Sequence, residues 1–119
     1  MAYRANIAIL LGDPSGIGPE LISKLLTKKE LDKANIVVIG EKNILEDANK
    51  LTGHSVKLKI IKDSSQINFD GKTKFFLDIS TGKNHKYELS KCSAESGKSV
   101  LNALNSALNL VNSKKINAI

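Results

Sequence analysis

Four short segments of the chain carry the apolar patterns that are typical of β-strands. Residues 6–11 form a short apolar run, and residues 35–40 form a β-branched run of the kind found in strands buried on both faces. Residues 74–79 form a further strand after a polar loop, residues 63–72. Residues 55–61 alternate between apolar and lysine side chains, which predicts a strand that buries Val56, Leu58 and Ile60.

Three further segments carry helical periodicity. The first begins at Pro19 and places four apolar residues on one face: Leu21, Ile22, Leu25 and Leu26. The second, residues 41–51, is closed by Gly53, and its apolar side holds Ile44, Leu45, Ala48 and Leu51. The longest, residues 94–113, is N-capped by Ser93 with Glu95 in its first turn. We expect its apolar stripe to be buried: Val100, Leu101, Leu104, Ala107, Leu108 and Val111.

The order of these elements is βαβαββα, followed by the start of a strand at residues 116–119. Alternating strands and helices predict a layered α/β fold with a mainly parallel sheet, in which residues 35–40 lie beside residues 6–11. No shift in composition marks an internal boundary, so residues 1–119 are one folding unit. Because the chain stops within an apolar run, we expect it to be the N-terminal part of a longer protein, incomplete by itself.

Composition narrows the class of protein. The 119 residues are 41% hydrophobic, as in ordinary globular domains, and carry a formal net charge of +6. The lysines are scattered, there is a single arginine, and the five aromatic residues have no stacking-motif spacing, so we expect no nucleic-acid partner. No apolar run approaches the roughly 20 residues of a membrane span. Cys92 is the only cysteine, which excludes an internal disulfide and fits a soluble, cytoplasmic protein.

A glycine-rich turn joins the first strand to the first helix. Residues 12–20 read Gly-Asp-Pro-Ser-Gly-Ile-Gly-Pro-Glu, and glycine permits both positive φ and close backbone approach to a ligand. Pro19 suits the first helical position, and the amides there could bind an anion, although Asp13 and Glu20 oppose a bare phosphate. The spacing matches neither the Walker A loop nor the dinucleotide fingerprint G-x-G-x-x-G. A structural turn and a ligand-binding turn are equally open on these grounds.

Other residues with chemical potential have plainer interpretations. His54 and His85 are isolated in loop contexts, which favours exposed or structural side chains over metal ligands. Cys92 precedes a helix start, where a thiolate is favoured, but it has no acid or histidine partner nearby in sequence and is interpreted as passive. Asp78 lies at a strand end, where it could line a cleft or cap a turn.

Taken whole, the nine-residue string resembles the Gly-Asp-Pro-Ala-Gly-Ile-Gly-Pro-Glu signature of the 4-hydroxythreonine-4-phosphate dehydrogenase family of pyridoxal phosphate biosynthesis. That family includes paralogues acting on 4-phosphorylated threonate or erythronate. Residues 93–98, which lead into the long helix, and residues 116–119 are similar to later parts of the same family. Two positions depart from its pattern: Leu10-Leu11 replaces a frequent Thr-Pro, and Ser15 replaces Ala. The first departure leaves the paralogues open.

The resemblance implies a two-domain α/β fold similar to isocitrate and isopropylmalate dehydrogenases, of which this chain is the N-terminal third. It also implies a homodimer that uses NAD or NADP and a divalent metal, Zn, Mg, Mn or Co, to oxidise and decarboxylate a 4-phosphorylated hydroxy acid such as 4-phosphohydroxy-L-threonine. The metal and catalytic residues are expected beyond Ile119, with none of the metal ligands in this segment. The glycine turn supplies the candidate cofactor-proximal residues: Gly12, Asp13, Gly16, Ile17 and Gly18.

Two other functions remain open at this stage. The first is an acyltransferase of the phosphate acetyltransferase kind, whose fold resembles that of this family. Binding of coenzyme A without response to NAD would favour it. The second is a non-catalytic binding or dimerisation module, which a stable, monodisperse chain that binds no nucleotide would support.

Overall fold

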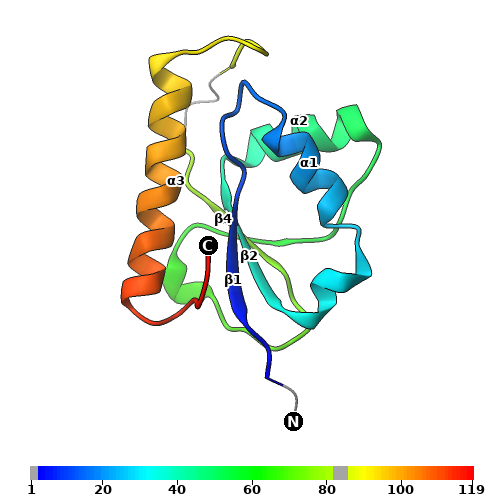
Figure 1. Cartoon of the computed structure of the whole chain (residues 1–119), viewed down its shortest axis with the longest axis vertical. Coiled ribbons are helices and arrows are strands. Elements are labelled where there is room, and N and C mark those ends of the chain that lie inside the picture. The colour runs from blue at the N-terminus through cyan, green and yellow to red at the C-terminus, as the bar shows by residue number, and fades with distance from the viewer. Residues whose placement is uncertain (1–2, 82–85) are drawn as a thin grey trace.

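The computed structural model describes residues 3–81 and 86–119, and four strands in these residues form one parallel sheet (Figure 1). The strands are β1 (Asn6–Leu10), β2 (Asn35–Gly40), β3 (Lys59–Ile61) and β4 (Phe75–Asp78), in the spatial order β1-β2-β4-β3. All three strand pairs are parallel, which confirms the predicted sheet and the place of residues 35–40 beside β1.

The last residues of the chain lie along the outer edge of β1. Ala118 forms an isolated parallel bridge with Ile7, and the Ala8 amide donates to the Ala118 carbonyl at 3.0 Å. Ile116 is buried against the same core cluster as Ala8. The predicted start of a strand at residues 116–119 is therefore present as a single bridge.

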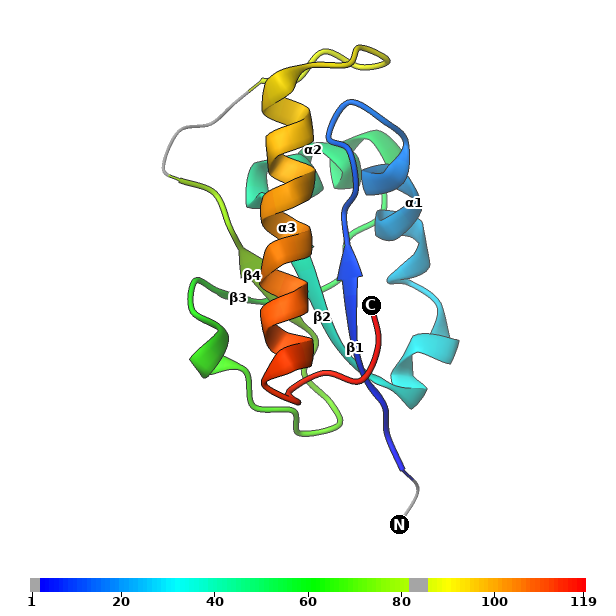
Figure 2. The ribbon, with the colours of Figure 1, turned by 60° about the vertical axis from the view of Figure 1, so that its left-hand side comes forward.

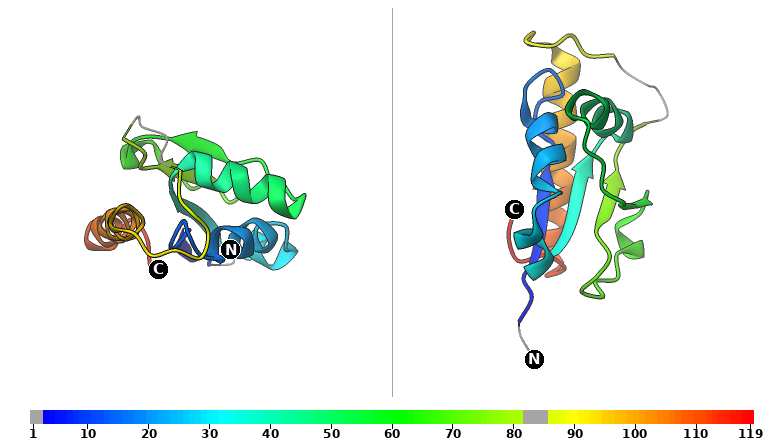
Figure 3. Two further views of the ribbon diagram at one scale, coloured as in Figure 1. Left: turned by 90° about the horizontal axis from the view of Figure 1, so that it is seen from above. Right: turned by 90° about the vertical axis from the view of Figure 1, so that its right-hand side faces the viewer.

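Three helices cover the two faces of the sheet: α1 (Gly18–Leu25), α2 (Lys42–Thr52) and α3 (Ala94–Asn112). Helices α1 and α2 pack together on one face, and α3 packs on the other against β1 and β2 (Figure 2). Seen from above, the strands lie between α3 and the other two helices (Figure 3). Two short 3₁₀ turns, η1 (Lys29–Lys33) and η2 (Ser64–Gln66), complete the connections.

Strand β2 is the centre of the core and is buried on both faces, as its sequence predicts. Val37 and Ile39 face α3, where they join a cluster with Phe75, Leu77 and three residues of that helix: Ala103, Ala107 and Leu110. Ile36 and Val38 face the opposite way, where they pack with Phe76 and with residues of α2: Ile44 and Leu45. A β-branched run without alternation is what such a doubly covered strand requires.

The predicted strand at residues 55–61 is only partly correct. Only Lys59–Ile61 pair with β4, because β3 is a short edge strand with a single neighbour in the described residues. The face is also wrong at one position, since Ile61 is 2% exposed and Ile60 is 42% exposed. Val56 and Leu58 still pack against the cluster beneath α1 and α2, from outside any strand.

The predicted buried stripe of α3 is also wrong in part. Ala107 is buried as expected, but Leu101, Leu104 and Leu108 are 60%, 36% and 44% exposed. The face toward the sheet is instead formed by Ser96, Ala103, Ala107 and Leu110. Small side chains let the helix backbone approach the sheet closely, so the leucine row is turned away from it. Leu21 and Leu25 of the first predicted helix and Leu51 of the second are also exposed. In these helices the predicted apolar face is broader than the surface that contacts the rest of the protein.

The predicted ends of the helices are confirmed where the structure describes them. Ser93 accepts from the Ser96 amide at 3.1 Å in a capping box, and Gly53 closes α2 with a φ of 71°. The first helix begins at Gly18 rather than Pro19, with Ile17 at its N-cap. Gly82, Asn84 and His85 of the predicted loop lie outside the described residues. None of the helices in the described ranges has the length and apolar content needed to cross a membrane.

Candidate functional site

The carboxyl ends of β2 and β4 lie next to each other, because Gly40 and Asp78 are partners in the sheet register. Helix α2, which follows β2, packs on one face of the sheet, and α3, the helix that follows β4, packs on the other face (Figure 3). In an open parallel sheet, neighbouring strands whose connections go to opposite faces leave a crevice beyond their carboxyl ends, where ligands bind. The topology therefore predicts a ligand site at this edge of the sheet.

The glycine turn, residues 12–18, follows β1 at the same edge of the sheet. Gly12 has a φ of 79°, a left-handed conformation that non-glycine residues adopt at a cost. Gly18 lies so close to the end of β1 that a Cβ built there would be 2.4 Å from the Leu11 carbonyl oxygen. These two glycines are required by the shape of the turn itself.

Asp13 organises the middle of the turn. Its carboxylate accepts from the Ser15 amide at 2.8 Å, and its carbonyl accepts from the Gly16 amide at 3.0 Å. The Ser15 carbonyl in turn accepts from the Ser90 amide at 2.7 Å, which ties the segment before α3 to the turn. Two amides that could have faced an anion are thus used internally. The hydroxyl of Ser15 is buried and has no hydrogen-bond partner among the described residues.

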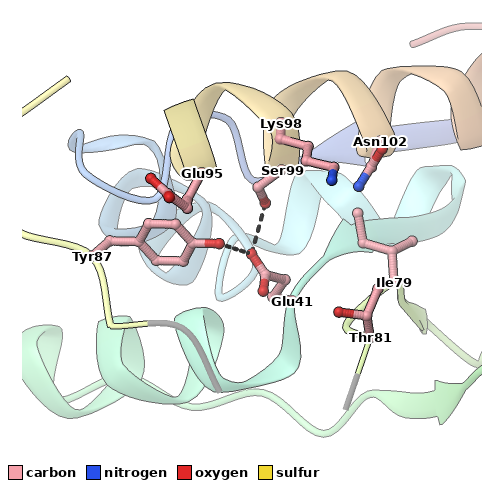
Figure 4. A pocket seen from close by; sticks show the side chains of 8 residues that line it. All are labelled: Glu41, Ile79, Thr81, Tyr87, Glu95, Lys98, Ser99 and Asn102. Atoms are coloured by element: carbon pink, nitrogen blue, oxygen red, sulfur yellow. Dashed lines mark hydrogen bonds between the residues drawn. The ribbon is translucent and has the colours of Figure 1, made fainter. Parts of the chain in front are cut away.

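A cavity of about 170 Å³ lies in the crevice between β2, β4 and α3 (Figure 4). We call it the Glu41 cavity, after the residue that directly follows β2. Figure 4 shows side chains extending from α3 toward the side on which Glu41 and Ile79 lie: Lys98, Ser99 and Asn102. Tyr87 approaches Glu41 from the segment between β4 and α3.

Glu41 is 6% exposed, and its carboxylate is held on one side only. Oε2 accepts from the Tyr87 hydroxyl at 2.7 Å and from the Ser99 hydroxyl at 2.7 Å. Oε1 has no hydrogen-bond partner among the described residues, and no ion pair with Glu41 occurs there. Burial and the hydrogen bond to Glu41 raise the pKa of Tyr87 to about 12, so this phenol is a neutral donor at physiological pH.

Asp78 is equally buried, at 6% exposed, but is fully used by the protein. One oxygen accepts from the amides of Lys42 and Ser80, at 3.3 and 3.0 Å, and the other pairs with Lys62 at 2.8 Å. Burial would by itself raise the pKa of Asp78, but the bonds from Lys62, Ser80 and Lys42 lower it overall. Of the two interpretations of Asp78 offered by the sequence, the turn cap is the one that its contacts describe.

A larger hollow of about 460 Å³ lies between α1 and α2, on the other side of Tyr87, which lines both cavities. Its walls include the two prolines of the glycine turn, Pro14 and Pro19, together with Ile44. Oε2 of Glu20 is buried at this hollow without a hydrogen-bond partner among the described residues. The two cavities share Tyr87 as a lining residue, and one is lined by residues of the turn and the other by Glu41.

Comparison with known proteins relates this chain to dehydrogenases of phosphorylated substrates. No protein-family model matches the chain. A 4-hydroxythreonine-4-phosphate dehydrogenase of Sulfurihydrogenibium sp. is 34% identical over 117 residues, which are 96% of this chain and 34% of that protein. A Fusobacterium nucleatum protein with the provisional name D-threonate 4-phosphate dehydrogenase is 31% identical over 98% of this chain and 35% of its own length. The crystal structure of a Burkholderia phymatum 4-hydroxythreonine-4-phosphate dehydrogenase superposes with a TM-score of 0.86 at 28% identity, over 99% of this chain and 36% of that one.

The chain is a homologue of these dehydrogenases. It spans about a third of the length of the curated relatives it matches. The resemblance seen in the sequence is therefore confirmed, and so is the α/β fold with its parallel sheet. Ser15, where the family signature has Ala, has a buried hydroxyl without a hydrogen-bond partner among the described residues.

The structure brings one of the five predicted cofactor-proximal residues of this dehydrogenase homologue next to the Glu41 cavity. Gly12 and Glu41 both line a narrow hollow under the turn. The other four predicted residues lie farther along the turn and line neither of the two larger cavities: Asp13, Gly16, Ile17 and Gly18. Ile17 is 72% exposed. His54 is exposed on the α2–β3 connection, and Cys92 is exposed before α3.

Sequence reasoning missed the residues that line the Glu41 cavity. The sequence predicts only the start of a helix at Glu41 and only positions on the long helix for Ser99 and Asn102. Lys98 belongs to the segment 93–98 that resembles the family, but no role follows for it from that resemblance. A usable signal was present, because an acidic residue directly after a buried parallel strand lies where such sheets bind ligands. Nothing in the sequence, however, indicates that α3 and Tyr87 meet that residue.

Proposed function

We propose that this chain is part of an NAD(P)- and divalent-metal-dependent dehydrogenase that oxidises and decarboxylates a 4-phosphorylated hydroxy acid. The homology described above carries the proposal, since it extends over nearly the whole chain to proteins named as dehydrogenases of such substrates. The two kinds of relative supply two substrates to test, 4-phosphohydroxy-L-threonine and D-threonate 4-phosphate. The erythronate analogue is a third.

The reaction moves a hydride from the secondary alcohol of the substrate to the nicotinamide ring, releases the hydroxyl proton, and then releases carbon dioxide from the keto acid. We propose that the metal ligands belong to the part of the relatives that this chain does not span. The described residues contain no group of three side chains suited to a metal ion. What this chain offers is a rigid edge: a turn fixed by its own glycines, and a cavity with an available carboxylate oxygen.

We propose the glycine turn as the cofactor side of that site, with Gly12, Asp13, Gly16, Ile17 and Gly18 as the proximal residues. The size of the Glu41 cavity fits a part of a dinucleotide rather than the whole of one. Sites for drug-sized ligands have about 300–1,000 Å³, whereas the Glu41 cavity has about 170 Å³. A second wall, from beyond this chain, is needed to enclose the cofactor. A homodimer in the cytoplasm is part of the same proposal, in keeping with a single cysteine.

The test is an assay of the natural gene product that contains this chain. Each of the three substrates is offered with NAD and with NADP, and formation of reduced nicotinamide is followed with and without a chelator and with added Mg²⁺, Mn²⁺, Co²⁺ or Zn²⁺. Turnover that needs both nucleotide and metal supports the proposal. Binding of coenzyme A with no response to either nucleotide would instead identify an acyltransferase, and absence of any nucleotide or coenzyme A binding would indicate a non-catalytic module.

A further inference from the structure

The carboxylate of Glu41 is half used by the protein. Both of its hydrogen-bond donors, Tyr87 and Ser99, are on Oε2. Oε1 has no hydrogen-bond partner among the described residues, and Glu41 is one of the residues that line the cavity (Figure 4). A buried carboxylate that lines a cavity and has one oxygen without a hydrogen-bond partner in the described residues is a group available to a ligand.

No cation in the described residues offsets this charge. Lys98 lines the same cavity but forms no ion pair with Glu41, whereas the equally buried Asp78 is paired with Lys62. Burying an unpaired charge is costly, and natural proteins accept such a cost mainly at functional positions. The contrast between the two neighbouring carboxylates therefore singles out Glu41.

The polar groups around the cavity select one ligand chemistry. Glu41 and the exposed Glu95 offer only acceptors, Lys98 offers only donors, and Thr81 and Asn102 offer both. An ionised phosphate or carboxylate would face the charge of Glu41 with acceptors alone, and an ammonium group would face Lys98 with donors alone. An uncharged hydroxyl both donates and accepts, so two adjacent hydroxyls can satisfy Glu41 and Lys98 or Asn102 at once.

We infer that the Glu41 cavity binds an uncharged vicinal diol, with Oε1 of Glu41 accepting from one hydroxyl. The volume of about 170 Å³ suits a sugar ring or a short polyol rather than a complete cofactor. Two sources of such a diol exist if the proposed function holds: a ribose of the nicotinamide nucleotide, or the two hydroxyls of a phosphorylated dihydroxy acid. The choice between these sources rests on the proposed function, and the diol chemistry itself does not.

The test measures binding by calorimetry to the natural gene product, with probes that differ by one hydroxyl. AMP and nicotinamide mononucleotide are each compared with the 2′-deoxy form, and D-threonate 4-phosphate is compared with its 3-deoxy form. A charge-assisted hydrogen bond corresponds to a preference of about ten-fold or more for the hydroxylated probe in one pair. The first two pairs identify nucleotide ribose as the source, and the third identifies the substrate.

Two variants connect that preference to Glu41. Glu41→Gln keeps the shape and an acceptor for Tyr87 and Ser99, and it should reduce the preference to about two-fold or less. Glu30→Gln removes the same charge from an exposed residue that lines none of the cavities described above, and it should leave the preference unchanged. The comparison within each probe pair on the unaltered protein needs no variant, so it remains decisive even if a variant folds poorly.

Equal affinity within all three pairs overturns the inference, and so does a preference that Glu41→Gln leaves intact. The outcome is separable from that of the proposed function. A Glu41-dependent diol preference in a protein that oxidises none of the substrates would sustain the inference and refute the dehydrogenase. Turnover without any such preference would do the reverse.

Discussion

The glycine turn and the Glu41 cavity lie at the same edge of the sheet, but they use their polar groups in opposite ways. In the turn, Asp13 accepts hydrogen bonds from two backbone amides of the turn itself. In the cavity, Glu41 leaves one carboxylate oxygen open. The motif that is conspicuous in the sequence is thus largely occupied with its own geometry, whereas the carboxylate available to a ligand belongs to no motif.

This difference has an energetic consequence. Groups that hold backbone geometry contribute to folding, so altering them should lower the free energy of unfolding. A buried charge held open for a ligand contributes little to folding or opposes it, so altering it should affect binding alone. Substitutions on the two sides of the comparison should therefore separate stability from binding.

The largest effect is expected at Gly18. A Cβ there would lie 2.4 Å from the Leu11 carbonyl oxygen, which is backbone and cannot simply rotate away. We expect Gly18→Ala to lower the free energy of unfolding by about 3 kcal/mol, measured by urea denaturation. Gly97→Ala is the matched control, because nothing lies within 4 Å of a Cβ at that helical position; it should stabilise by up to about 1 kcal/mol. A tolerated Gly18→Ala would show that the turn is looser than its packing indicates.

The second largest effect is expected at Asp78. This residue is buried like Glu41, but its carboxylate accepts from backbone amides, as that of Asp13 does. We expect Asp78→Asn to lower the free energy of unfolding by about 2 kcal/mol, because the ion pair with Lys62 and the charge-assisted amide bonds are weakened. The pKa of Asp78 is lowered on folding, so its contribution is present above pH 3.8 and is lost as the pH falls through the lowered value. As the pH falls through this range, the free energy of unfolding should decrease less in the variant than in the unaltered protein. Identical denaturation curves would mean that Asp78, like Glu41, contributes little to folding.

The fold could be predicted from the sequence to the extent that it depends on local pattern. The β-branched run of β2 specifies a doubly covered strand, and Ser93 and Gly53 mark helix ends by mechanisms that act within a few residues. The pattern failed where burial depends on a distant partner. The leucines of α3 satisfy helical periodicity, but which side faces the sheet is decided by the small residues Ala103 and Ala107.

The site shows the same division. The turn is a contiguous string, so its position and its glycine requirements could be derived from nine residues. The Glu41 cavity joins the end of β2 to Tyr87 and to α3, which are separated by 46 and 58 positions at the two hydrogen bonds. Such a constellation exists only once the sheet order is known, and no spacing rule along the chain describes it.

A smaller effect, of opposite sign, is expected at Ser15. Its hydroxyl is buried without a partner among the described residues, and an unsatisfied buried hydroxyl costs free energy. We expect Ser15→Ala, which restores the residue of the family signature, to raise the free energy of unfolding by about 1 kcal/mol in the same urea experiment. Destabilisation by this change would mean that the hydroxyl has a role in the turn that its contacts do not show.

The smallest effect on stability is expected at Glu41 itself. This substitution is the strictest test of the contrast between the glycine turn and the Glu41 cavity. Glu41→Gln removes a buried charge that has no cationic partner in residues 3–81 and 86–119, and it retains an acceptor for Tyr87 and Ser99. The free energy of unfolding should therefore change by less than about 0.5 kcal/mol or increase. A loss close to that of Asp78→Asn would make Glu41 a structural residue and end the contrast.

The phenol of Tyr87 reports whether the substitution acts where it should. Burial comes first and Glu41 second among the causes that raise the pKa of Tyr87 to about 12, so removing the charge should lower this pKa part of the way toward 10. Because the pKa is raised on folding, the associated stability is present below pH 10 and is lost as the pH rises through 12. Ultraviolet titration in a Tyr3→Phe background isolates this phenol, the second of two tyrosines. An unchanged pKa would mean that Tyr87 does not donate to Glu41 in solution, and the cavity would then lack the wall that holds its carboxylate.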